Sequence, residues 1–252
     1  MKNNRITQSI IIGFTTLLAT FSWAGLKNIL SGDTNWIWPS IGFLILLIFL
    51  CLSLLLLKSK LISLITLAII LISFLFSFGF KLEYLTVLFL ALLFFIFGAF
   101  RIINEKEVRI KFTIIRILRY GLPHILTGLA IIIAAAYYFS PLAIQGDNRI
   151  EIPRPLFDVV IQPIVSASEL SNEEFTDMLY VAINQEINKR SEAYKEYLPI
   201  GFAVGIFFAI KVISIFFMWL VILISWMIFK FLTSLNAIKI QEKSVLKEVI
   251  EI

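Results

Sequence analysis

The chain has 252 residues, of which 60% are hydrophobic and only 15% are charged, and its formal net charge is +5. This balance excludes an ordinary soluble domain, in which about a quarter of the residues are charged. The single cysteine, Cys51, excludes an intrachain disulfide and a cysteine-rich metal site. The composition therefore predicts an all-α integral membrane protein.

Six apolar runs of 17 to 30 residues are the basis of this prediction. A helix of about 20 residues crosses the hydrocarbon core of a bilayer, which is about 30 Å thick. An isolated segment in lipid must satisfy its own backbone hydrogen bonds, so each run is expected to be a transmembrane helix. The runs cover residues 9–26, 36–57, 61–80, 84–100, 121–140 and 200–229.

The first four runs form one block, residues 1–100, in which only short connections separate the expected helices. Short connections make neighbouring helices antiparallel, as in an up-down bundle. Aromatic side chains at the predicted outer ends of these helices are expected to anchor at the lipid headgroups. They are Trp23, Trp36, Trp38 and Tyr84.

Residues 101–120 are expected to form a basic cytoplasmic juxtamembrane loop before the fifth helix, residues 121–140. The loop carries six Lys or Arg residues against two Glu, and its pattern predicts a short strand at 108–112 and an interfacial helix at 114–120. Its basic side chains are expected to contact anionic lipid headgroups, at about 1 kcal/mol each. Alternatively, these basic side chains bind no ligand and only determine the membrane topology ahead of the fifth helix. These side chains are Arg109, Lys111, Arg116 and Arg119.

Residues 141–198 contain ten acidic and five basic residues, and we expect them to form a small, mainly helical extracytoplasmic cap between helices five and six. Ser171 and Glu174 fit a capping box, which predicts the start of an amphipathic helix. The apolar side of this helix is the expected interface of the cap. It consists of Phe175, Leu179, Ile183 and Ile187.

The sixth helix, residues 199–230, contains the longest apolar run, 200–229, which as a helix is about 45 Å long. The one charged residue of this apolar run, Lys211, allows two interpretations. Either Lys211 lies at the outer headgroups and residues 200–210 continue above the bilayer, or the helix is tilted and Lys211 lies inside.

Small residues recur at every fourth position near the start of this sixth helix, and they are Gly201, Gly205 and Ala209. Such spacing removes bulk from one face and allows a second helix to approach closely. The fifth helix of the same chain and a second copy of the protein are equally good candidates for that second helix.

A cytoplasmic N-terminus places fourteen Lys or Arg residues on the inner side of the membrane and seven on the outer side. This bias predicts that both termini, including the tail at 231–252, are cytoplasmic. The abundance of Ile, Lys, Asn and Phe indicates an AT-rich genome, and we therefore expect a bacterial inner-membrane protein.

Ionisable residues are almost absent from the apolar runs, with only Lys211 and His124 lying in or beside one. Transporters, pumps and intramembrane enzymes need such groups at membrane depth. We therefore expect no catalytic residue, metal, cofactor or nucleic acid, and a non-enzymatic, oligomeric or partner-binding membrane component. Its partners would be lipid, a second copy, or another membrane or extracytoplasmic protein. The alternative is a homo-oligomeric channel lined by helix six with Lys211 facing the lumen.

Overall fold

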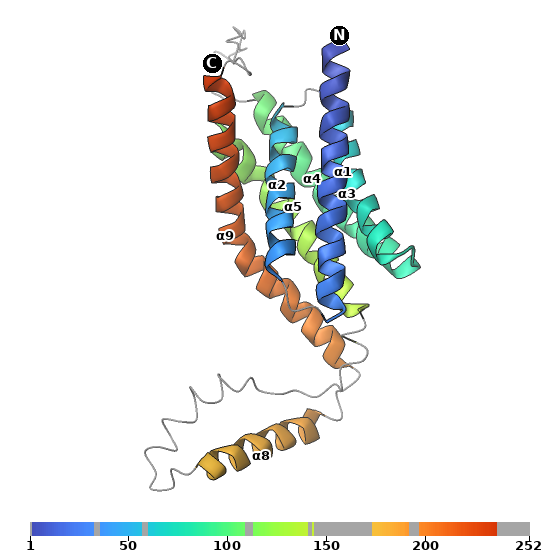
Figure 1. The fold of residues 1–252 in the computed structure, drawn as a ribbon, viewed down its shortest axis with the longest axis vertical. Helices are drawn as coiled ribbons and strands as arrows, with labels where there is room; N and C mark the ends of the chain where they lie inside the picture. The colour runs from blue at the N-terminus through green and yellow to red at the C-terminus, as the bar shows by residue number, and fades with distance from the viewer. Residues whose placement is uncertain are drawn as a thin grey trace, which may run out of the picture.

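The computed structural model describes residues 2–32, 36–56, 60–108, 113–140, 143, 173–191 and 197–235. These residues form helices and contain no strand, which confirms the all-α prediction for this part of the chain. The helices are α1 (Lys2–Leu30), α2 (Ile37–Leu56), α3 (Lys60–Phe78), α4 (Leu82–Val108), α5 (Ile114–Tyr138), α8 (Glu173–Ser191) and α9 (Leu198–Ser234) (Figure 1).

Five of the described helices, α2, α3, α4, α5 and α9, are long and apolar enough to cross a membrane. The chain is thus a multi-pass membrane protein. The first predicted span, residues 9–26, falls within α1, which packs against α2 and α3. A sixth crossing by α1 stays a prediction.

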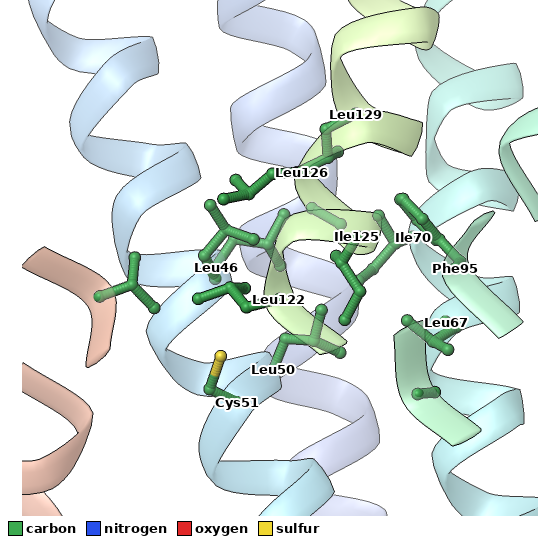
Figure 2. Packing of buried hydrophobic residues seen from close by; sticks show 14 of the residues in the cluster. Leu46, Leu50, Cys51, Leu67, Ile70, Phe95, Leu122, Ile125, Leu126 and Leu129 are labelled. Atoms are coloured by element: carbon green, nitrogen blue, oxygen red, sulfur yellow. The ribbon is translucent and has the colours of Figure 1, made fainter. Parts of the chain in front are cut away.

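The bundle consists of α1 to α5 and α9, and the start of α1 lies at the same end as the end of α9 (Figure 1). The closest pairs are α4 with α5, α5 with α9, and α1 with both α2 and α3. Helix α5 is central to the packing. Figure 2 shows side chains of α5 packed among those of α2, α3 and α4, including Leu122, Ile125, Leu126, Leu46, Leu50, Leu67 and Phe95.

Glycines bring α4 and α5 together. A Cβ atom built on Gly121 would overlap the carbonyl oxygen of Gly98, and one built on Gly98 would lie 2.7 Å from the carbonyl oxygen of Gly121. Two turns further along α5, a Cβ atom built on Gly128 would lie 2.7 Å from the ring of Phe95. Side chains at these positions would force the two backbones apart.

Two of the four aromatic residues expected at the headgroups are buried instead. Trp23 is 0% exposed, and its indole N–H donates a 2.9 Å hydrogen bond to the carbonyl oxygen of Ile70. Tyr84 is 4% exposed and packs edge-on against Phe74. The expectation was wrong for both, because neighbouring helices cover these rings.

By contrast, Trp36 and Trp38 are 65% and 62% exposed. Both lie at the start of α2, where an amphipathic ring is suited to the headgroup region.

The connection between α4 and α5 is shorter than the predicted loop at 101–120. Helix α4 continues to Val108, and α5 begins at Ile114. Ile102 and Ile117 are fully buried, so tertiary packing extends both helices beyond their apolar runs. The segment 114–120 is therefore the start of α5 rather than a separate interfacial helix.

Val108 is the last residue of α4, so the predicted strand does not begin there. The rest of that strand, residues 109–112, and its expected partner in the tail, residues 249–252, lie outside the described residues.

Polar contacts tie three helix ends together at the end of α4. Lys60 of α3 forms an ion pair with Glu107 of α4 at 3.0 Å. Lys106 donates hydrogen bonds of 3.2 Å to the carbonyl oxygens of Leu54 and Leu55, which lie in the last turn of α2. A cation at the carbonyl end of a helix is favourable, because it satisfies free acceptors and opposes the helix dipole.

The glycine contact between α4 and α5 gives a stability prediction. Gly121→Ala should destabilise the protein by about 1–3 kcal/mol, because the added methyl group overpacks the contact with Gly98. Thermal unfolding in detergent would measure the change. Gly13→Ala on α1 is the matched control, since no described atom lies within 4 Å of its Cβ position. Equal effects of the two substitutions would contradict the close packing.

Candidate functional site

The one lysine within the apolar part of α9 contacts α5. The ammonium nitrogen of Lys211 donates a 2.8 Å hydrogen bond to the hydroxyl oxygen of Thr127, and both residues are half-buried. The hydroxyl of Thr127 in turn donates to the carbonyl oxygen of Pro123 at 2.7 Å. This chain of hydrogen bonds is the most polar feature at the α5–α9 contact.

The local sequence orients the hydroxyl group of Thr127 so that it can accept the hydrogen bond from Lys211. A threonine hydroxyl in a helix commonly bonds to the carbonyl four residues earlier, which here is that of Pro123. The same oxygen keeps lone pairs that can accept a bond from Lys211. On α9, Ser214 donates to the carbonyl oxygen of Lys211 at 2.7 Å. The hydroxyl groups of Thr127 and Ser214 are therefore each bonded within their own helix, whereas the ammonium group of Lys211 bonds across to α5.

The register of α9 places Lys211 near the middle of α5. Thr127 lies thirteen residues after the first residue of α5 and eleven before the last. Eight residues later on α9 and eight residues earlier on α5, the guanidinium carbon of Arg119 lies 5.6 Å from the ring centroid of Trp219. The two contacts agree with one antiparallel alignment. Lys211 thus contacts α5 at a half-buried position, and its depth in the membrane stays a prediction.

Two further basic residues contact one aromatic ring near this hydrogen bond. His124 is one turn before Thr127, and its ring meets that of Phe97 edge-on at 4.7 Å. The guanidinium carbon of Arg101 lies 4.9 Å from the centroid of the same Phe97 ring. Basic side chains of α4 and α5 therefore share the ring of Phe97.

Among the described residues, no carboxylate is seen in an ion pair with Lys211. The ion pair between Lys60 and Glu107 lies at the ends of their helices. None of the six apolar runs contains Asp or Glu. The described residues also contain no group of three His, Cys, Asp or Glu side chains that could hold a metal ion.

The small residues of α9 lie away from the bundle. Gly201, Gly205 and Ala209 are exposed, and no described atom lies within 4 Å of a Cβ built on either glycine. Helical spacing puts them on the side opposite the buried residues of α9, which are Ser214, Val221, Ile222, Ser225 and Phe229. Lys211 and the glycines therefore belong to different faces of one helix.

The basic residues predicted to contact lipid are only partly described. Arg116 and Arg119 are exposed in the first turns of α5, with Arg119 over the ring of Trp219. Arg109 and Lys111 lie outside the described residues.

The predicted cap helix corresponds to α8. Leu179 and Ile183 are partly exposed on it, whereas the side chains of Phe175 and Ile187 and the capping residue Ser171 lie outside the described residues.

Sequence reasoning missed Thr127 as the partner of Lys211. The available signal was weak, namely one hydroxyl residue four positions after Pro123 in an otherwise apolar run. It likewise did not identify Gly98 and Gly121, which lie at the ends of separate runs. Their pairing depends on how α4 and α5 align.

The chain matches no protein-family model, and no characterised protein or solved structure shows significant similarity to it.

The contact between Lys211 and Thr127 can be tested by a double-mutant cycle. Thr127→Val should destabilise the wild-type protein by about 1–3 kcal/mol, because the ammonium group loses its hydrogen-bond acceptor. In the Lys211→Met background, Thr127→Val should lower the free energy of unfolding much less. Unfolding in detergent would measure each variant, with Thr127→Ser as the control that keeps the hydroxyl. Additive effects would show that the two side chains do not interact.

Proposed function

We propose that the chain is a non-enzymatic multi-pass membrane protein that acts as an oligomeric or partner-binding component of a membrane assembly. The observation that supports this function is the uncovered half of α9. No side chain between residues 198 and 213 is buried in the described structure, although this half is rich in large apolar residues. Exposed examples are Ile200, Phe202, Val204 and Phe208.

The length of α9 argues that lipid alone does not cover it. The apolar run at 200–229 is about 45 Å long as a helix, against about 30 Å of hydrocarbon. To bury the whole run, α9 would need a tilt of about 48°, whereas transmembrane helices usually tilt by 0–40°. A neighbouring protein helix would cover what the bilayer leaves exposed.

The face with Gly201, Gly205 and Ala209 is the part of α9 best suited to such a neighbour. Small residues let two backbones approach closely, and close van der Waals packing drives helix association in lipid. Within the described residues no helix of the same chain occupies this face. A second copy of the protein supplies an identical face and is the simplest partner for it.

We place the protein in a bacterial inner membrane with both termini cytoplasmic and with α8 on the outer side. The bias of Lys and Arg between the two sides supports this orientation. Two cytoplasmic termini also require an even number of membrane crossings, and α1 would supply the sixth. Arg116 and Arg119 would then contact anionic headgroups of the inner leaflet.

The channel alternative receives less support from the geometry. A pore lined by several copies of α9 would need Lys211 to face the central axis. Instead, Lys211 donates its hydrogen bond to α5 of its own chain, and its position along α9 matches the buried side.

The proposed self-association predicts a specific loss of mass. Gly201→Leu combined with Gly205→Leu should convert the assembled protein to a smaller species, because the added side chains block close approach. The fold should be unaffected, since neither position contacts the rest of the described chain. Light scattering of the gently solubilised protein, with the detergent mass subtracted, would measure the result.

Gly13→Leu is the control for this experiment, because Gly13 is also a helical glycine with open space around it. It should leave the mass unchanged. A wild-type protein that is monomeric and free of other proteins would refute the proposed function. An unchanged mass in the double variant would refute the glycine face as the contact.

The orientation of Lys211 also predicts the result of a flux experiment. The wild-type protein reconstituted in vesicles should show no ion-selective flux, and Lys211→Glu should not create or reverse one. Anion-selective flux that Lys211→Glu converts to cation selectivity would favour the channel instead.

A further inference from the structure

We propose that Lys211 is the docking point for a transmembrane helix of a different protein that carries Asp or Glu at the depth of Thr127. This inference rests on the proposed function, because it names the chemistry of one partner of the assembly. It concerns the edge of α9 beside α5, where Lys211 is half-buried and Phe208 and Ile215 are exposed, whereas the glycine face is left for self-association.

The hydrogen bonding of Lys211 is incomplete within the described chain. An ammonium group has three N–H donors, and only one of them has an acceptor here, the hydroxyl oxygen of Thr127. That oxygen is neutral and is also engaged with Pro123. Charges buried in protein or lipid are normally paired with an opposite charge. A carboxylate would supply both the charge and the missing acceptors.

The protein itself cannot supply this carboxylate from its apolar runs, because none of them contains Asp or Glu. A second copy lacks it for the same reason. A carboxylate at this depth of the membrane would therefore come from a different protein.

The position of Lys211 favours a protein helix over a lipid headgroup. Thr127 is eight residues, about 12 Å, along α5 from Arg119, which we place at the headgroups, and about 17 Å from the last residue of α5. A phosphate stays at the membrane surface, whereas a carboxylate on a spanning helix lies at any depth. Phe208 and Ile215, one turn before and after Lys211, are 61% and 56% exposed. They offer the apolar contact that such a helix needs.

A synthetic transmembrane peptide of Leu and Ala with one central Asp is the probe. The full-length protein and the labelled peptide would be reconstituted together in phosphatidylcholine bilayers, and energy transfer would report their association. The Asp peptide should bind roughly tenfold more tightly than the same peptide with a central Leu. A peptide with a central Asn separates charge pairing from neutral hydrogen bonding, and it should not reproduce the preference.

The variants of the protein test whether Lys211 is responsible. Lys211→Met should abolish the preference for the Asp peptide, whereas Lys211→Arg, which keeps the charge and shows that the fold persists, should retain it. Lys230→Met is the matched control, since Lys230 lies near the end of α9 over the ring of Trp226. It should leave the preference unchanged.

Three results would overturn the inference. They are equal binding of the Asp and Leu peptides, an unchanged preference in Lys211→Met, and loss of the preference when phosphatidylglycerol is added. The last result would identify a lipid headgroup as the occupant. None of them alters the mass expected for the glycine variants, so failure here is distinguishable from failure of the proposed function.

Discussion

The close approach of α4 and α5 is the constraint on which the bundle depends. Gly98 and Gly121 leave no room for a side chain between the two backbones, so these helices have essentially one way to align. Their pairing fixes the orientation of α5, whose remaining sides are packed against α2 and α9. Because α5 is central, the hydroxyl of Thr127 meets α9, and this contact determines which residues of α9 face inward.

Helix α9 joins two kinds of chemistry on opposite faces. Its inner face carries Lys211, which is bonded to Thr127 and is seen in no ion pair among the described residues. Its outer face presents Gly201 and Gly205 with open space around them. One face is suited to a charged partner and the other to close backbone packing. Both proposals thus arise from a single helix that its own chain covers only in part.

Much of the fold follows from sequence because membrane helices are specified locally. The run at 36–57 became α2 (Ile37–Leu56), and the run at 61–80 became α3 (Lys60–Phe78). The helix ends next to polar segments were not predictable in the same way. The extension of α4 to Val108 depends on Ile102 being buried by neighbouring helices. Likewise, Trp23 is buried because α3 supplies the carbonyl of Ile70 for its indole N–H.

The sequence by itself determined the number and position of the apolar runs, the absence of carboxylates within them and the presence of one lysine in the last. These properties depend on composition and on spacing along a single helix. Only the tertiary structure decided that Lys211 meets Thr127, which lies 84 positions earlier in the chain, and that Gly201 and Gly205 face outward. The physical reason is that the rotation and register of a helix are set by its packing against neighbours, which its own sequence does not encode.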